Sequence, residues 1–355
     1  MNTTHKPMRL CLVADDVRHP LDEGFKKAIT SMIGCLQQRH ESLVVGRNIE
    51  AEIGKTVTQN RLLLSARLAR AIRVFRPDIV IYFPMASITV GSFVRSRILR
   101  LYSGVPTAMV GLQPRTYGPL ARRMVAALSP DIVFVQSWRS VAVLQGLGMR
   151  AGYLPSGVDL ARFQPAPSEK RVALRIKHGL PTNRKILLHV GHLNRDRGID
   201  LLAMLASSSL LPLLVTSTST VPDEGFRREL EEKGVRIVTR YLPDIEELYQ
   251  LADVYLFPTY HVTSAIEFPL SVLEALACGI PVLSTRFGAL DTYFDSNSWF
   301  RFFASREEAR VGLGALLACG EHARPAIRKA VETRFSWDAV CASLLNQCVL
   351  DHVAK

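Results

Sequence analysis

The chain has 355 residues, of which 48% are hydrophobic and 21% charged, a composition typical of globular proteins rather than disordered or fibrous ones. This length favours two domains over one. The formal net charge of +12 is concentrated in residues 1–150, which carry 21 basic and 9 acidic groups, whereas residues 151–355 carry 23 of each. The basicity therefore belongs to one part of the chain and needs a local explanation.

The sequence predicts neither a membrane span nor a secretory leader. The uncharged apolar stretch at residues 79–94 is interrupted by Pro84 and Gly91 and is shorter than the roughly 18 to 20 apolar residues that a span needs. The apolar run before Asp15 and Asp16 is too short for a signal-peptide core, which predicts a cytosolic location. The cysteines show no CxxC spacing, and we expect reduced core thiols with neither disulfides nor a metal site. They are Cys11, Cys35, Cys278, Cys319, Cys341 and Cys348.

Apolar runs alternate with helix-length amphipathic stretches, the pattern of parallel sheets covered by helices. In the first half we expect strands at residues 10–14, 79–83, 107–110 and 132–135. After the proline-flanked segment 154–165 we expect strands at 186–190, 213–216, 235–238, 254–257 and 282–284. We predict two doubly wound α/β domains, over residues 1–153 and 154–335, followed by a C-terminal helical segment over 336–355.

An open parallel sheet binds ligands beyond the carboxyl ends of its strands, so the loops after each strand are the places to inspect. The first such turn, LVADDVRHPLDEGFKKA, contains the single glycine Gly24 and lacks the GxGxxG dinucleotide fingerprint. This absence disfavours an NAD-dependent dehydrogenase.

The segment TSAIEFPLSVLEALACGIPV, residues 263–282, predicts a helix over about 269–278, with Pro269 in its first turn and Gly279 just past its end. The first-turn amides of this helix, including those of Leu270 and Ser271, form an anion site that suits a diphosphate. Glu274 lies among apolar helix residues, where a carboxylate is costly unless it accepts hydrogen bonds. Sugar hydroxyls are suitable donors, and a surface-facing carboxylate is the alternative.

A second candidate site is HVGHLNRDRGIDLLAML, residues 189–205, which predicts a strand, a loop and a helix. Gly191 permits a close backbone approach, and the guanidinium groups of Arg195 and Arg197 match phosphate oxygens. On its own this loop also fits a solvated basic surface, and His192 alone fits a structural histidine.

Four segments together are more specific: LPSGVDLARFQP, HVGHLNRDRG, RYLPDIEELYQLADVYLFPTY and EFPLSVLEALACGIPVLSTRFGAL. In order and spacing they resemble the retaining family-four glycosyltransferases (glycosyl transferases group 1) of GT-B fold. The resemblance covers about residues 150–340, and the terminal FSWDAVCASLL is similar to that family's closing helix. It implies two Rossmann-like domains facing a cleft, with the closing helix packing back on the first domain.

The resemblance also implies roles for individual residues. His192 and Arg197, in the loop that begins at Gly191, would contact the nucleotide diphosphate, and Glu274 would hold the ribose. Tyr241 lies in the stretch that meets the nucleobase. The helix start would meet the diphosphate and the sugar through Phe268, Pro269, Leu270 and Ser271. Arg197, His192 and Glu267 are the expected catalytic residues.

The sequence departs from the family pattern in two places. Glu267 and Glu274 have six residues between them, where the family has seven, so either a shorter loop still lets Glu267 reach the sugar or that contact is lost. The histidine that commonly follows a strand in the acceptor domain is absent, and His19 and Gly24 are the weak acceptor-side candidates.

The resemblance implies an enzyme that moves a sugar from a nucleotide-diphosphate sugar to an acceptor, with retention and without a metal or other cofactor. The alternative is a nucleotide-sugar-binding protein of the same fold without transferase activity. Nucleic-acid binding has only the net charge in its favour. The sequence specifies neither the sugar, the base nor the acceptor.

Arginines recur along three predicted helices of the first domain. Arg61, Arg67, Arg70, Arg73 and Arg76 are expected on one helix, and Arg95, Arg97, Arg100, Arg122 and Arg123 on two others. Such helices could lie on an anionic membrane surface and present a lipid-linked or anionic acceptor to a peripheral enzyme at the inner face of the membrane. Solvated faces of core-packed helices are the competing interpretation.

Overall fold

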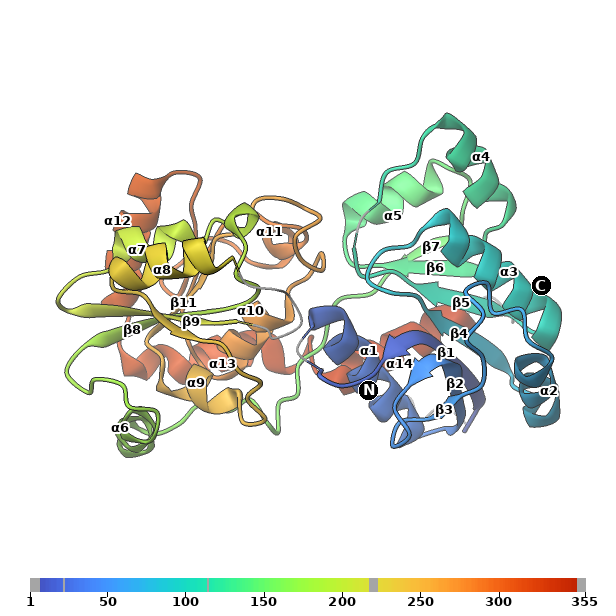
Figure 1. The fold of residues 1–355 in the computed structure, drawn as a ribbon, viewed down its shortest axis with the longest axis horizontal. Coiled ribbons are helices and arrows are strands. Elements are labelled where there is room, and N and C mark those ends of the chain that lie inside the picture. Colours follow the sequence, from blue (N-terminus) through green and yellow to red (C-terminus); the bar gives the residue numbers. More distant parts are fainter. Residues whose placement is uncertain (1–6, 22, 114, 217–222, 350–355) are drawn as a thin grey trace. The chain divides into compact units, whose positions relative to one another are not determined.

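The computed structural model describes residues 7–21, 23–113, 115–216 and 223–349 (Figure 1). Within it the chain forms two compact units. The first consists of Met1–Ser156, Ile266–Phe268 and Trp337–Lys355, and the second of Gly157–Ala265 and Pro269–Ser336. Three residues from the middle of the second unit's sequence are thus grouped with the first unit.

The first unit is built on a parallel sheet with the strand order β3-β2-β1-β4-β5-β6-β7. Its strands are β1 (Arg9–Val17), β2 (Glu41–Ile49), β3 (Lys55–Thr56), β4 (Ile79–Phe83), β5 (Thr107–Val110), β6 (Ile132–Val135) and β7 (Ala151–Tyr153). Its helices are α1 (Gly24–Gln37), α2 (Ala66–Phe75), α3 (Val90–Ser103), α4 (Pro119–Ala127), α5 (Trp138–Gln145) and α14 (Trp337–Val349). The order reverses between β1 and β4, which is the switch point of a doubly wound sheet.

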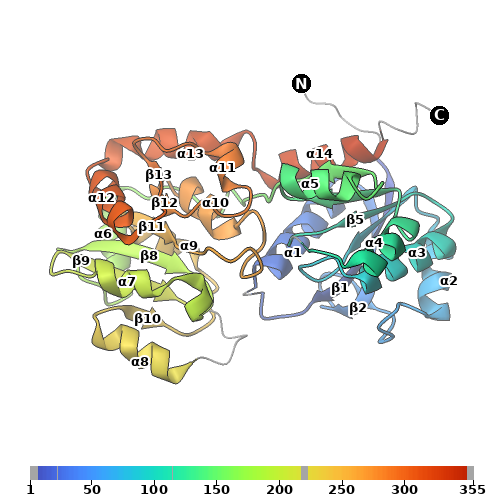
Figure 2. The ribbon, with the colours of Figure 1, turned by 90° about the horizontal axis from the view of Figure 1, so that it is seen from above.

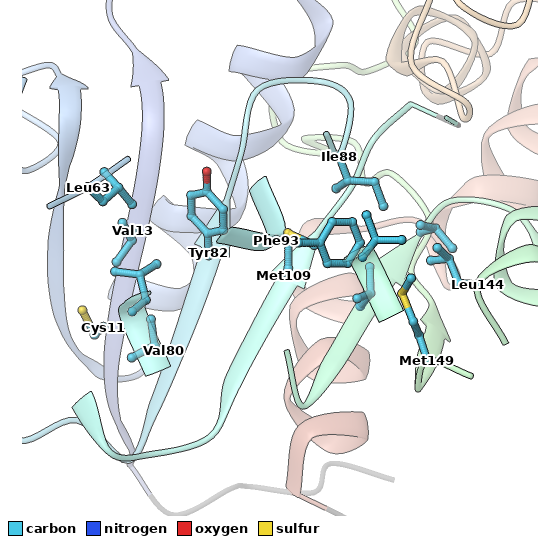
Figure 3. Packing of buried hydrophobic residues seen from close by; sticks show 14 of the residues in the cluster. Cys11, Val13, Leu63, Val80, Tyr82, Ile88, Phe93, Met109, Leu144 and Met149 are labelled. Atoms are coloured by element: carbon cyan, nitrogen blue, oxygen red, sulfur yellow. The ribbon is translucent and has the colours of Figure 1, made fainter. Parts of the chain in front are cut away.

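One face of this sheet packs against α2, α3, α4 and α5 through a continuous apolar cluster. Figure 3 shows side chains of this cluster lying in a row across the strands, with Tyr82 and Phe93 near its centre. In Figure 2, α2, α3 and α4 lie together along one side of the unit. The alternate strand residues, such as Leu10 and Leu12, are also buried, so the sheet is covered on both faces.

Helix α14 packs against α1, as expected for the closing helix. The Cys341 Sγ lies 3.8 Å from the carbonyl oxygen of Met32, and Arg39 and Asp338 form an ion pair of 2.9 Å. The prediction that this helix returns to the first domain is confirmed. Residues 350–355 of the predicted segment lie outside the described residues.

The second unit is built on a parallel sheet with the strand order β10-β9-β8-β11-β12-β13. Its strands are β8 (Lys185–Val190), β9 (Leu210–Val215), β10 (Arg236–Val238), β11 (Val254–Phe257), β12 (Val282–Ser284) and β13 (Phe300–Phe302). Its helices are α6 (Ser168–Lys177), α7 (Asp200–Leu205), α8 (Glu224–Glu232), α9 (Glu246–Leu251), α10 (Leu270–Ala277), α11 (Leu290–Tyr293), α12 (Arg306–Leu317) and α13 (Arg324–Glu332), with single 3₁₀ turns η1 (Arg195–Arg197) and η2 (Glu321–Ala323). The order reverses between β8 and β11.

Each predicted strand is present, with ends shifted by up to three residues, and the α/β fold class is confirmed. The sequence analysis missed β2, β3, β7 and β13. It was also wrong about the arginine helix: α2 begins only at Ala66, so Arg61 precedes it, and Arg76 is its C-cap with a left-handed φ of 51°. The other two groups of arginines lie on α3 and α4 as predicted.

The C-terminal end of α10 depends on Gly279, whose φ is +70°. A Cβ at this position would lie 2.8 Å from both the Cβ and the carbonyl oxygen of Arg324, the first residue of α13. The predicted left-handed residue after this helix is therefore confirmed, and it also lets α13 approach α10.

We predict that Gly279→Ala lowers the free energy of unfolding by about 1–3 kcal/mol, because it adds a steric clash to backbone strain. Gly234→Ala is the matched control: Gly234 has a φ of +86° but no atom within 4 Å of a new Cβ, so strain alone acts there. Denaturant titration of both variants measures the difference. Equal losses would show that the contact with Arg324 contributes nothing.

Candidate functional site

The candidate donor site lies in the second unit, at the carboxyl ends of β8 and β11. These adjacent strands flank the point where the strand order reverses, and a doubly wound sheet binds ligands at such a point. The loop that begins at Gly191 follows β8, and the connection to α10 follows β11. The topology therefore brings together the two segments that the sequence analysis selected separately.

Arg197 is the most deeply placed cation of this site. Its Nη2 donates a hydrogen bond to the backbone carbonyl of Ser264, in the loop after β11. Burial lowers the pKa of its guanidinium to about 10, so the group remains charged at neutral pH. The structure describes no carboxylate paired with Arg197, so an incoming anion would meet a cation whose charge is not neutralised.

Gly191 is required by the packing around Arg197. A Cβ at Gly191 would lie 2.8 Å from the Nη1 of Arg197 and 2.8 Å from the Nε2 of His189. Gly198, which follows η1, has a φ of +68°, and a Cβ there would lie 2.6 Å from the carbonyl oxygen of Pro258. Both glycines thus let this loop lie against its neighbours, and Gly191 leaves room for the arginine.

His189 was missed by the sequence analysis as a component of this site. It is fully buried, and its Nδ1 lies 2.8 Å from the carbonyl oxygen of Leu256, which makes Nδ1 the donor. Burial lowers the pKa of its imidazole to about 4, so the ring is neutral at physiological pH. Its Nε2 has no hydrogen-bond partner within the described part of the chain. The continuous apolar run of β8 could have indicated its burial, but not its position beside Arg197.

Helix α10 begins at Leu270, with Pro269 as its N-cap and no side chain capping its first amides. Those amides remain available to an anion. The sequence analysis placed Pro269 inside the helix, and the structure places it one position earlier, where its backbone is extended. The side chain of Ser271 contacts the hydroxyl of Tyr255, which is buried on β11.

Glu274 is buried on α10, and its Oε2 accepts a hydrogen bond of 2.6 Å from the hydroxyl of Tyr249. This bond explains how the carboxylate is tolerated among apolar helix residues. It also contradicts a surface-facing Glu274. Tyr249, from α9, was another residue that the sequence analysis missed, because nothing in its local pattern indicates a partner 25 residues away.

The remaining predicted donor residues differ in their surroundings. His192 is half-buried, and Tyr241 is 46% exposed. Arg195 forms an ion pair of 2.8 Å with Glu229 and lies 4.0 Å from the ring centroid of Phe226. Arg195 therefore has partners on α8, whereas Arg197 points to the loop after β11.

Glu267 and Phe268 are grouped with the first unit. The Oε1 of Glu267 accepts hydrogen bonds from the hydroxyls of Ser137, at 2.5 Å, and Ser140, at 2.8 Å, and burial raises the pKa of the carboxyl. The amide of Phe268 donates to the Oε1 of Gln136, at 3.1 Å. A sugar contact by Glu267 stays a prediction, and its carboxylate already has two serine partners.

The acceptor-side candidates lie near the carboxyl end of β1. His19 is exposed, and its amide donates to the Oε2 of Glu50 at 3.3 Å. Gly24 is the first residue of α1. Their roles stay predictions.

Within the described ranges, no group of three or more His, Cys, Asp or Glu side chains could hold a metal ion, and the six cysteines are free thiols. None of the described helices combines the length and apolar character that crossing a membrane requires.

The two doubly wound sheets define a GT-B fold. The structure of Anabaena Alr3699/HepE in complex with UDP is similar over 96% of this chain and 99% of its own, with a TM-score of 0.77 and 15% identity. Sucrose-phosphate synthase from Thermosynechococcus elongatus is similar over 98% and 100%, with a TM-score of 0.74 and 16% identity.

Residues 184–307 match the family model of glycosyl transferases group 1, and the predicted resemblance to that family is confirmed. Alpha-galactosylglucosyldiacylglycerol synthase of Streptococcus pneumoniae is 27% identical over 59% of this chain and 56% of its own length. D-inositol 3-phosphate glycosyltransferase of Xylanimonas cellulosilytica is 33% identical over 56% and 50%. The chain thus spans about half the length of these curated relatives.

We predict that Gly191→Ala weakens the binding of UDP or another nucleoside diphosphate by tenfold or more, because the new methyl group displaces Arg197. Gly314→Ala is the matched control, since a Cβ at Gly314 on α12 has no atom within 4 Å. Titration calorimetry measures the affinity, and circular dichroism checks the fold. Unchanged affinity in Gly191→Ala would contradict the proposed position of the diphosphate.

Proposed function

We propose that this protein is a glycosyltransferase that moves a sugar from a nucleotide-diphosphate sugar to an acceptor with retention of anomeric configuration. The observation that carries the proposal is the half-buried Arg197 cation and the uncapped start of α10, both close to Tyr255 at the switch point of the second sheet. Both features favour a diphosphate at one place. The family match covers this same region.

In the proposed reaction, the bond between the anomeric carbon and the diphosphate oxygen breaks, a bond from the acceptor oxygen to that carbon forms, and the proton of the acceptor hydroxyl passes to the leaving diphosphate. The leaving diphosphate gains negative charge in the transition state. Arg197, together with His192 and the amides of Leu270 and Ser271, would stabilise that charge electrostatically. These groups could neutralise the leaving group without a metal ion, and this is why we propose a metal-independent enzyme.

Retention is proposed from the family resemblance, and the names of two relatives agree with alpha-linked products. One is the alpha-galactosylglucosyldiacylglycerol synthase, and another is a GDP-mannose-dependent alpha-(1-6)-phosphatidylinositol dimannoside mannosyltransferase of Mycobacterium tuberculosis.

Glu274 would hold the donor ribose with the carboxylate oxygen that Tyr249 does not occupy. Thermal-shift measurements with UDP-, GDP- and ADP-sugars would identify the donor, because a ligand that binds the native state raises its stability.

We predict that Arg197→Ala lowers kcat by roughly 100-fold or more, the usual effect of removing one group that stabilises transition-state charge. Arg195→Ala is the matched control, because Arg195 is already paired with Glu229 and should leave kcat within a few-fold of the wild type. Steady-state kinetics, with thermal unfolding to verify folding, test the pair. Near-wild-type turnover of Arg197→Ala would refute its role.

We propose further that the acceptor is anionic or lipid-linked and that the first unit lies at an anionic membrane surface on the cytosolic side. Large apolar side chains are exposed among the arginines of α2, α3 and α4: Val74 is 74% exposed, Leu101 67% and Leu120 74%. Arginines with apolar neighbours of this kind suit a membrane interface. Two relatives have diacylglycerol or phosphatidylinositol in their names.

We predict that the full chain co-sediments with anionic vesicles at low salt and is released at high salt, because surface electrostatics are screened. Vesicles of phosphatidylcholine alone are the control and should not bind the chain. Failure to bind anionic vesicles at low salt would refute the membrane surface as a partner, while leaving the donor site untouched.

A further inference from the structure

A basic hollow lies in the first unit at the amino ends of β1 and β4. Arg9 begins β1, and Arg76 and Asp78 come just before β4. The two strand starts are held together by a bond of 2.7 Å from the amide of Arg9 to the Oδ2 of Asp78, and by one of 2.8 Å from the amide of Asp78 to the carbonyl of Arg9. This edge is opposite to the carboxyl ends of the strands, where doubly wound sheets bind their reactants.

The hollow measures about 640 Å³, which is within the range of about 300–1,000 Å³ typical of small-molecule sites. Four arginines and three small or apolar residues line it: Arg9, Arg70, Arg73, Arg76, Ala66, Ala69 and Val74. Five of them recur at spacings of three and four along α2, and so share one helix face. Because Ala66 and Ala69 have short side chains, the arginines surround an open space rather than a filled one.

The charge in this hollow is incompletely neutralised. Arg9 is paired with Glu41 at 3.0 Å and lies 4.8 Å from the ring centroid of Phe75. Arg70, Arg73 and Arg76 form no ion pair with any carboxylate in the described ranges. Like charges gathered in one hollow repel each other, so a bound anion would be stabilised there, and guanidinium forks match phosphate oxygens.

The surroundings favour one source of phosphate over others. Val74 lines the hollow and is 74% exposed, and Leu101 of α3, a helix that packs on α2, is 67% exposed. A free phosphate ion offers nothing for these side chains to contact. A phospholipid membrane offers both a headgroup phosphate for the arginines and an apolar acyl region for Val74.

We infer that this hollow binds the phosphate of an anionic phospholipid headgroup and holds the first unit on the membrane without taking part in the chemistry. The inference rests on the proposed membrane partner and deepens it by assigning a phosphate-binding site to the residues of this hollow. Binding here should be separable from the reaction, because the hollow lies at the edge of the sheet that does not face the reactants.

The test compares two double variants that remove the same charge. Arg70→Ser with Arg73→Ser changes the hollow, whereas Arg97→Ser with Arg123→Ser removes exposed arginines of α3 and α4. The full chain is sedimented with phosphatidylcholine vesicles containing phosphatidylglycerol. We expect the first pair to lose tenfold or more in vesicle affinity and the second pair to lose less than threefold. Equal losses would overturn the site, since they indicate diffuse surface charge.

Two further measurements keep the outcome decisive. Arg70→Lys with Arg73→Lys preserves the charge but not the guanidinium fork, and we expect this double variant to lose several-fold in vesicle affinity. Wild-type affinity would overturn a shaped phosphate site.

Titration with inorganic phosphate and with glycerophosphate identifies the source of the phosphate: binding of either without vesicle binding would overturn the lipid assignment. Nucleoside diphosphate affinity should be unchanged in every variant, and since vesicle binding needs no turnover, an inactive transferase would not affect the result.

Discussion

The partial burial of Arg197 is the constraint on which the candidate site of the second unit depends. A guanidinium out of water is costly unless it is paired or hydrogen-bonded, and here the described partner is one backbone carbonyl, that of Ser264. The cost is visible as a pKa lowered to about 10. Gly191 and the neutral ring of His189 make the space for this cation without adding a counter-charge. An anion such as the proposed diphosphate would supply the missing counter-charge.

The part of the candidate site around Glu274 differs, because this carboxylate already has a hydrogen-bond partner within the protein. Glu274 is oriented by the hydroxyl of Tyr249, whose ring packs 5.8 Å from that of Tyr255. Burial and the nearby Glu274 carboxylate raise the pKa of Tyr249 well above its usual range, so its hydroxyl remains a donor. The carboxylate is therefore fixed in place before any ligand binds, in keeping with preorganisation.

Local sequence patterns predicted the parts of the fold that local forces determine. Strands β8 and β11 and helix α10 were found because apolar runs, Pro269 and Gly279 mark their ends. Strand β13, only three residues long, was missed because it carries Arg301 and depends on pairing with β12. Likewise β2 includes Gly46, Arg47 and Asn48, and its pairing with β1 outweighs their low strand preference.

Local sequence patterns predicted the surroundings of the candidate-site residues less well than they predicted the helices and strands. Arg195 and Arg197 are two residues apart and chemically identical, yet Arg195 is exposed and pairs with Glu229, while Arg197 is half-buried beside Gly191. Only tertiary structure distinguishes them. Similarly, the six residues between Glu267 and Glu274 gave no sign that the structure groups Glu267 with the first unit. There the hydroxyls of Ser137 and Ser140 donate hydrogen bonds to its carboxylate.

The two parts of the chain differ in how many of their arginines form ion pairs with carboxylates. In residues 151–355, where basic and acidic groups balance, many arginines are paired inside the unit: Arg171 and Arg175 both bind the buried Asp253 and lower the pKa of its carboxyl. In residues 1–150 there are too few carboxylates to pair every basic side chain, and Arg70, Arg73 and Arg76 gather at one edge of the sheet. An excess of cations that contributes nothing to internal pairing raises the self-repulsion of the folded unit. The anionic surface proposed above as the partner of this unit would relieve that repulsion.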